Sequence, residues 1–396
     1  MALNKQVWLN TIVEKFFPDN SFALKSVDDS AYVNNKTVHV PNAGAPSSVT
    51  VNRQQLPASV SRRTDYDLEY EIDELTTDPI LIPNIDTVEL SYDKRHSVLT
   101  NDKQQLRTVA EQNLLYRWFL NDNVIKTTGD GQDAHTSSTA TGQRRKITKH
   151  DVLELMKKFN TDDVPKENRY LLLDSVMYAD LIADLSEKEL WAFQASADVE
   201  NGIMGKLYSF QVMERSQVLR TAANGTSLLK WDENAVAGEK AAGIAWQHGC
   251  VSRAMGEVKM FDSTDDPTYY GDIYSFLLRF GGKYRRYDKK GVGLIVEDTY
   301  TAQPTIEGAD SISLTSGAGS IVRTYATSDG SDITAESDAD WLTASVNGKK
   351  VTLTRTAYTY DAEGTPTRTA TLTIGIVGTS VTKTVTVTQE MAANGG

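Results

Sequence analysis

The chain has 396 residues, 40% of them hydrophobic and 24% charged, an ordinary balance for a folded protein of two or three domains. Its formal net charge of −12 argues against sequence-specific nucleic-acid recognition, which needs a concentrated basic face. The single cysteine, Cys250, cannot form an intramolecular disulfide. The sequence lacks signal-peptide features, and no apolar run approaches the ~20 residues of a membrane helix. We therefore expect a protein that is made and kept in a cytoplasm, or in particles assembled there, without a membrane partner.

The first segments are short. Apolar residues at helical spacing predict an amphipathic helix over 8–17, which Pro18 ends. A strand is expected at 37–40, running into a bend rich in proline, glycine and serine at 41–48.

Residues 65–73 are the clearest periodic segment of the chain, because apolar and acidic residues alternate there without a break. In a strand this places the apolar residues on one face and the acidic residues on the other. We predict residues 49–53 as the antiparallel partner, which gives a long two-stranded ribbon with an acidic stem and a basic tip. The charged residues assigned to this ribbon are Arg53, Arg62, Arg63, Asp65, Asp67, Glu69, Glu71 and Asp73.

An isolated two-stranded ribbon is marginal in water, so this one needs a surface to lie on. A neighbouring subunit is a candidate for that surface. The alternative is that the acidic residues simply face solvent.

Helix patterns follow the ribbon. Asn101 is expected to cap a helix of about five turns that ends near Trp118. After a polar loop at 127–142, Thr148 and Asp151 resemble a capping box and open a second helix. Residues 169–173 are predicted as a buried strand, and Asp174 as the cap of a further helix that ends at Leu185.

The remainder divides into two parts. Up to Glu297 the chain is predicted as mixed α+β, with strands at 209–214 and 291–297, while 269–280 is compatible with helix or strand. After about Thr299 only Thr/Val/Ile alternations remain, and Asn347-Gly348 is a strong two-residue hairpin signal. The sequence therefore predicts a separate β-sandwich of fewer than a hundred residues, joined by a hinge at 300–304.

No pattern of catalytic or ligand-binding residues is present. The five histidines lie far apart, and the chain has neither a phosphate-binding glycine loop nor a nucleophile elbow. His248 and Cys250 suggest a thiol–imidazole pair, but a buried structural cysteine is favoured. The acidic loops at 130–133 and 264–267 do not follow a calcium-binding pattern, so solvated charges are favoured over a weak ion site. We expect no enzyme, no cofactor and no metal site.

Two basic clusters interrupt the acidic background. Such clusters pair with an acidic neighbour or face nucleic acid, and the alternative is a solvated or internally paired surface. The clusters consist of Arg144, Arg145, Lys146 and Lys149, and of Lys283, Arg285, Arg286, Lys289 and Lys290.

The order of elements over about residues 1–298 resembles that of the major capsid proteins of tailed phages, which have the Hong Kong 97-like fold. Residues 38–44 and the ribbon to Asp73 are similar to the extended hairpin loop of that fold, and the helix ending at Trp118 is similar to its spine helix. Residues 163–174 resemble a stretch ahead of the domain around the capsomer axis. Residues 203–212 resemble a strand pair of the family, with Ser209 in place of the usual glycine.

The resemblance implies an α+β capsid fold over residues 1–299, with peripheral and axial domains. Its parts would be an N-terminal arm at 1–30, the extended hairpin loop at 38–75, the spine helix at 99–121 and a mainly axial domain at 148–260. It implies a structural virion protein that self-assembles, in the host cytoplasm, into the hexamers and pentamers of an icosahedral capsid enclosing double-stranded DNA. The partners implied are packaged DNA, contacted non-specifically, and portal and scaffolding proteins. Because the capsid-like sequence begins within about ten residues of Met1, we expect a separate scaffolding protein or none.

The C-terminal strands resemble a second family, the BACON immunoglobulin-like domains, through residues 340–342, 351–355, 368–373 and 385–389. This resemblance implies an all-β immunoglobulin-like domain at 303–391 that is displayed on the surface and binds host-surface or mucus glycans. No binding residue is carried over. Trp341 is expected in the core of the sandwich rather than at a sugar platform.

Two other functions remain as alternatives. One is a carbohydrate-binding surface adhesin, against which the missing signal peptide and the capsid-like first three quarters argue. The other is an encapsulin-like compartment shell, which shares the fold but fits an appended surface domain less well than a virus does.

Overall fold

The computed structural model describes residues 17–42, 49–54, 56–57, 60, 62, 66–84, 94–137, 139–360 and 364–393. The chain forms two compact units, one ending at Tyr300 and the other beginning at Thr301. The predicted helix over 8–17 lies outside the described residues except for Phe17, and so do most residues of the predicted bend at 41–48.

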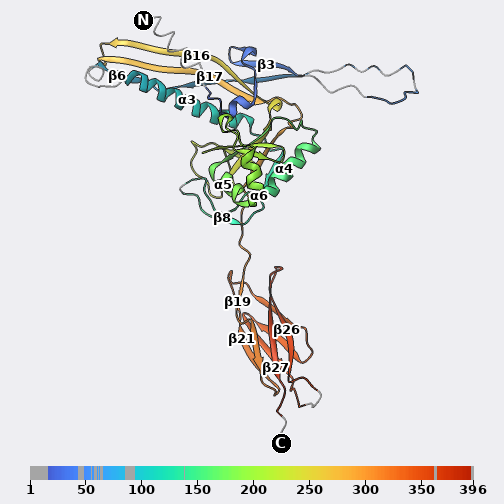
Figure 1. Ribbon diagram of the computed structural model, residues 1–396. Helices are drawn as coiled ribbons and strands as arrows, with labels where there is room; N and C mark the ends of the chain where they lie inside the picture. Colours follow the sequence, from blue (N-terminus) through green and yellow to red (C-terminus); the bar gives the residue numbers. More distant parts are fainter. Residues whose placement is uncertain are drawn as a thin grey trace. The chain divides into compact units, whose positions relative to one another are not determined.

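An eight-stranded mixed sheet forms the centre of the first unit (Figure 1). Its main path is β11-β12-β10-β15-β13-β14, with β18 beside β15 and β7 beside β18. The strands are β7 (Val124–Lys126), β10 (Arg169–Asp174), β11 (Gly205–Leu207), β12 (Phe210–Arg215), β13 (Leu219–Thr221), β14 (Leu228–Leu229), β15 (Lys240–Gln247) and β18 (Val292–Val296).

Strand β10 shows that this sheet is covered on both faces, because all of its residues are buried. Leu171 and Leu173 belong to one hydrophobic cluster, whereas Tyr170 and Leu172 belong to another, as the two-residue period of a strand requires. The first cluster includes residues of three helices, and the second includes residues of the longest helix. The three are α4 (Lys149–Thr161), α5 (Ser175–Asp184) and α6 (Glu187–Ala195), and the longest is α3 (Lys94–Trp118).

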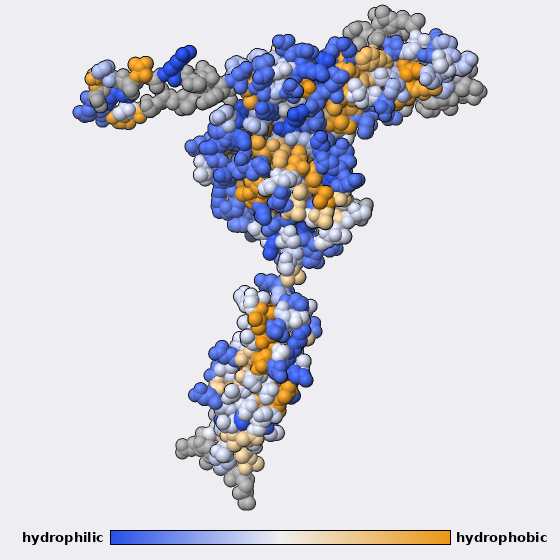
Figure 2. Space-filling view, turned by 180° about the vertical axis from the view of Figure 1, so that it is seen from behind, coloured by the Kyte–Doolittle hydropathy of each residue, from blue (hydrophilic) through white to orange (hydrophobic). Residues whose placement is uncertain are grey.

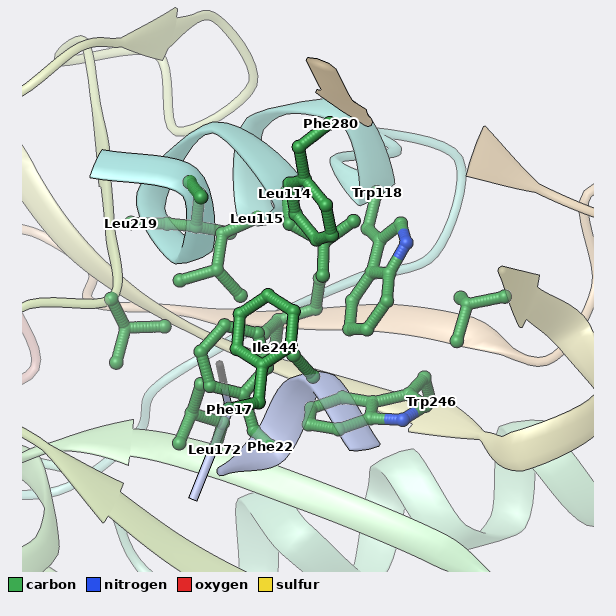
Figure 3. Close-up of a cluster of buried hydrophobic side chains, with 14 of the residues drawn as sticks. Phe17, Phe22, Leu114, Leu115, Trp118, Leu172, Leu219, Ile244, Trp246 and Phe280 are labelled. Carbon is green, nitrogen blue, oxygen red and sulfur yellow. The ribbon is translucent and has the colours of Figure 1, made fainter. Parts of the chain in front are cut away.

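Aromatic side chains join α3 to the central sheet (Figure 3). The rings of Trp118 and Trp246 lie 5.4 Å apart, and Phe22 meets both rings edge-on. Each buried indole also donates a hydrogen bond, Trp118 to the carbonyl of Ser252 and Trp246 to that of Lys25, both at 2.9 Å. Both indole N–H groups therefore have acceptors inside this apolar core, and these hydrogen bonds fix the orientation of the two rings.

A second sheet of the first unit packs beside α3 (Figure 1). Its order is β1-β16-β17-β5, and β6 pairs with the beginning of β17. The strands are β1 (Val27–Asp28), β5 (Asp73–Thr76), β6 (Ile80–Pro83), β16 (Val251–Asp266) and β17 (Gly271–Tyr284). The segment 269–280, which the sequence left undecided, is thus largely strand.

The ribbon is a third sheet of the first unit, formed by β2 (Val33–Asn34), β3 (Thr37–Asn42) and β4 (Tyr66–Glu71). The predicted partner of the alternating strand was wrong. β4 pairs with β3, from Thr37 opposite Glu71 to Asn42 opposite Tyr66, and residues 49–53 form no strand. The smaller elements are the hairpin β8 (Gly131–Asp133) and β9 (Gln143–Arg145) and the 3-10 turns Phe22–Lys25, Ser30–Tyr32, Val199–Asn201 and His248–Cys250.

The helix caps were predicted correctly in two of three cases. The Asp151 carboxylate accepts a hydrogen bond from the amide of Thr148 at 2.8 Å. Asp174 accepts from the amides of Val176 and Met177 in the first turn of α5, at 2.9 and 2.8 Å. Asn101 does not cap α3, because that helix begins at Lys94 and Asn101 lies within it.

The second unit consists of two main sheets around one core, the β-sandwich that its alternating strands predicted. One sheet has the order β20-β27-β26-β23 and the other β21-β25-β24, with a short pair β19-β22 beside them. Asn347 pairs with Lys350, so the two-residue turn is Gly348-Lys349, with positive φ at Gly348. The strands are β19 (Ile306–Glu307), β20 (Ser311–Leu314), β21 (Gly319–Thr324), β22 (Ala326–Thr327), β23 (Ile333–Ser337), β24 (Leu342–Asn347), β25 (Lys350–Arg355), β26 (Thr367–Ile376) and β27 (Thr382–Glu390).

Candidate inter-subunit surface

The stem of the ribbon has one apolar and one acidic face, as its alternation predicted. Tyr70 and Ile72 are buried in a small cluster with Val38, Val40 and Ala254. Asp67, Glu69 and Glu71 are exposed on the other face. His39 of β3 lies beside two of them, with Nδ1 3.1 Å from Asp67 and Nε2 3.8 Å from Glu69.

A buried polar cluster ties the base of the ribbon to the second sheet. The hydroxyl of Tyr70 donates to Asp29 Oδ2 at 3.3 Å and accepts from the Ser252 hydroxyl at 3.2 Å. The other oxygen of Asp29 accepts from Arg285 Nη1 at 2.5 Å. Burial raises the pKa of the Tyr70 phenol, so this hydroxyl stays a donor. We call Tyr70, Asp29, Arg285 and Ser252 the ribbon anchor.

Asp73, the last acidic residue of the alternating segment 65–73, forms hydrogen bonds within its own subunit. Its carboxylate accepts hydrogen bonds from Asn113 Nδ2 at 2.6 Å and from Arg117 Nε at 3.0 Å. Both partners lie on α3, so this acid joins β5 to that helix. Asp73 is therefore already paired within the subunit.

The tip of the ribbon is exposed where the structure describes it. Arg53 donates to the Thr50 hydroxyl at 3.2 Å, and Arg62 is exposed. Arg63 and Asp65 lie outside the described residues. Figure 2 shows hydrophobic residues beside hydrophilic ones at this tip.

The first basic cluster is paired within its own unit. Arg144 is buried, and its Nη1 lies 2.7 Å from Asp180 and 2.8 Å from Glu297. The remaining members also have partners. Arg145 donates to the carbonyls of Thr128 and Gly129 and lies over the Tyr300 ring, Lys146 pairs with Asp130, and Lys149 pairs with Glu189.

The second basic cluster is paired in the same way. Arg285 belongs to the ribbon anchor, and Lys283 donates to the carbonyl oxygen of Glu69 at 3.1 Å. The other three form ion pairs, Arg286 with Asp288, Lys289 with Asp122 and Lys290 with Asp162. Both clusters thus match the internally paired alternative, and Lys283 connects the cluster to the acidic stem.

Sequence reasoning missed the partners of Arg144. The carboxylate of Glu297 accepts from Arg144 and from His135 Nε2, at 2.8 and 2.9 Å. Burial alone would lower the pKa of His135, but the hydrogen bond to Glu297 and the charge of Glu297 raise it. His135 and Glu297 are 162 residues apart. No local sequence pattern indicates that pairing. The one local signal is the hydrophobic run of β18 directly before Glu297, which indicates that this carboxylate is buried.

Thiol and metal chemistry would depend on Cys, His, Asp and Glu side chains. Cys250 is buried, and burial raises the pKa of its thiol to about 11, which makes it a structural cysteine of low reactivity. In the described part of the chain no group of three or more His, Cys, Asp or Glu side chains is placed to hold a metal ion. Within the same residues no helix is long and apolar enough to cross a membrane.

No family model and no curated protein matches the chain. Solved structures are similar to it. A chain of the capsid of Ralstonia phage GP4 aligns over 74% of this chain and 92% of its own length, with 12% identity and a TM-score of 0.52. A chain of the capsid of the cyanophage P-SCSP1u (68% and 86% covered, 14% identity, TM-score 0.48) and one of a virus-like particle from Pyrococcus furiosus (73% and 96%, 10%, 0.42) are also similar.

The Ralstonia phage neighbour defines the class of fold. The likeness to the Ralstonia phage chain shows that the chain has a mixed α+β fold of the kind found in phage capsids. At 12% identity it shows the fold alone.

Proposed function

We propose that the chain is the major capsid protein of a tailed phage, with the Hong Kong 97-like fold, and assembles into a closed icosahedral shell around double-stranded DNA. The observation that carries the proposal is the fold likeness, which extends over nearly the whole length of the Ralstonia phage capsid chain. In this proposal the ribbon corresponds to the extended hairpin loop and α3 to the spine helix. Hexamers and pentamers of one chain, with portal and scaffolding partners, follow from the same resemblance.

The ribbon is the part of the chain that we assign to assembly. Its stem is held to the body by the ribbon anchor and its described tip is exposed, so the tip is free to reach a second subunit. Neither basic cluster is proposed as a DNA-binding surface, because their side chains are paired within the subunit.

The test of the basic tip is the double variant Arg62→Glu with Arg63→Glu. We expect folded subunits that fail to form particles, because reversing two charges opposes an acidic partner surface. The matched control is Lys166→Glu with Lys188→Glu, which makes the same charge change at two exposed positions outside the ribbon. Electron microscopy and circular dichroism are the measurements. Normal particles from the tip variant would show that the basic tip is not required for assembly.

For the second unit we propose a surface-displayed immunoglobulin-like domain of the BACON type. A chain that stops after Thr301 should then still form closed shells. The truncation follows Thr301 rather than Thr299 because Tyr300 belongs to the first unit. Its amide donates to the carbonyl of Gln143, and its ring lies under the guanidinium of Arg145. Absence of shells from the shortened chain would instead make the second unit part of the shell.

Glycan binding by this domain stays a proposal, and Trp341 is an unsuitable platform for it. The guanidinium of Arg368 lies 4.4 Å from the Trp341 ring centre and 4.7 Å from that of Tyr358. The cation occupies the space over the tryptophan ring that a sugar would need, and Trp341 also packs on the sandwich core. A glycan site would therefore lie elsewhere on the domain.

A further inference from the structure

A polar pocket with a volume of about 340 Å³ lies beside the two-residue turn that joins β11 to β12. Residues of this turn and of the two strands line one side, and residues 166–168 of the loop before β10 line the other. Every lining side chain ends in a polar group. The size is that of a small-ligand site, and the lining suits a polar ligand rather than an apolar one.

The lining supplies hydrogen-bond donors from several side chains. In the described part of the chain, the side chains of Asn168, Lys206 and Gln211 form no hydrogen bond or ion pair, so their N–H groups are available to a ligand. Tyr208 adds a phenol hydroxyl, and Glu167 is the one acidic residue of the lining. Such a set matches a ligand with several acceptor oxygens.

A buried cation lies behind the pocket. Arg169 is fully buried, and among the described residues no carboxylate pairs with it. Its guanidinium donates to the carbonyls of Val164 and Pro165, at 2.5 and 2.8 Å, and to the amide oxygen of Asn160 at 2.9 Å. These acceptors are neutral, as is the Phe159 ring below the guanidinium. Buried charges are normally paired with an opposite charge, so this one calls for an anion nearby.

Ser209 connects the buried cation to the pocket. Its hydroxyl oxygen accepts from Arg169 Nη1 at 2.9 Å, and the same side chain lines the pocket. A hydroxyl that accepts from a guanidinium keeps its own proton to donate, and the cation polarises that proton toward an anion. Lys206 adds a positive charge, whereas the charges of Lys166 and Glu167 offset each other. The pocket is therefore cationic in a chain with a net charge of −12.

We propose that this pocket binds a phosphate group, which accepts hydrogen bonds from the Ser209 hydroxyl, the Lys206 ammonium and the Gln211 amide. A phosphate carries several strong acceptor oxygens and negative charge, as the donors and the buried cation require. The bound group would tie the β11–β12 turn to the loop before β10. The site lies within one subunit, so the inference does not depend on the proposed shell function.

Titration calorimetry of the full-length chain with inorganic phosphate, at an ionic strength held constant with chloride, tests the site. We expect saturable binding of one phosphate and a rise in the thermal midpoint of the first unit. Lys206→Met should weaken binding about tenfold or more, because it removes a charge-assisted hydrogen bond. The matched control is Lys230→Met, which removes the same charge at an exposed position outside the pocket and should leave the affinity unchanged.

Ser209→Ala tests the link to the buried cation, and it should also weaken binding about tenfold. Because this variant removes an acceptor of Arg169, circular dichroism must show that it is folded. Lys206 is exposed, so Lys206→Met decides the matter if Ser209→Ala does not fold. No saturable binding of phosphate, or equal affinities for the unchanged chain and Lys206→Met, would overturn the proposal.

A second titration, with a short double-stranded DNA, identifies the source of the phosphate. Binding of the DNA that inorganic phosphate competes away, and that Lys206→Met weakens, would assign the pocket to a nucleic-acid backbone. Binding of inorganic phosphate without binding of the DNA would assign it to a free phosphate. Both results support a phosphate site, and failure of both ligands to bind refutes it.

Discussion

Replacing Asp29 by Asn should loosen the base of the ribbon. Asp29 is 1% exposed and accepts from both Arg285 and Tyr70, whereas an asparagine amide would turn a donor toward one of them. Removing one member of a buried ion pair costs about 3–5 kcal/mol. The Arg285 side chain is 24% exposed and keeps part of its hydration, so we expect about 2–3 kcal/mol.

Hydrogen exchange of the full chain measures this loss at the ribbon. The amide of Ile72 donates to the carbonyl of Lys36 at 2.9 Å, beside the anchor. A loss of about 2–3 kcal/mol should accelerate its exchange roughly 30- to 160-fold. The control is Asp288→Asn, which breaks the surface pair with Arg286 and should cost at most about 1 kcal/mol. If both variants accelerated exchange of the Ile72 amide equally, the ribbon anchor would not be what holds the base of the ribbon.

Two further predictions concern pairs inside the units. Because the folded-state pKa of His135 is raised, its pair with Glu297 stabilises the fold fully below about pH 6.5 and loses that effect as the pH rises through the raised pKa. The thermal midpoint of the first unit should therefore fall from pH 6 to pH 8, and fall less in His135→Asn. A pH dependence unchanged by that variant would contradict the pairing. Arg368→Lys should lose the stacking between Trp341 and Tyr358, about 1 kcal/mol, and lower only the calorimetric transition of the second unit, by about 4–8 °C. A shift of the other transition would contradict this assignment.

Local patterns predicted much of the fold. The alternation in 65–73 placed Tyr70 inside and Glu69 outside, and the acids Asp151 and Asp174 marked helix starts, because each depends on residues close in sequence. The second unit was predictable for the same reason, since each strand alternates and tight turns join its hairpins.

Long-range pairing was not predictable from the same patterns. The choice of β3 rather than 49–53 as the partner of β4 depends on the cluster around Ala254, far along the chain. The charges of Arg144 and Arg285 suggested exposed surface, yet each is paired with a carboxylate from another element.

Electron microscopy of the purified, concentrated full-length protein tests the central proposal most directly. We predict closed shells of uniform size, built from hexamers and pentamers of this one chain. A folded, monodisperse monomer under conditions in which scaffolding protein is also supplied would contradict it.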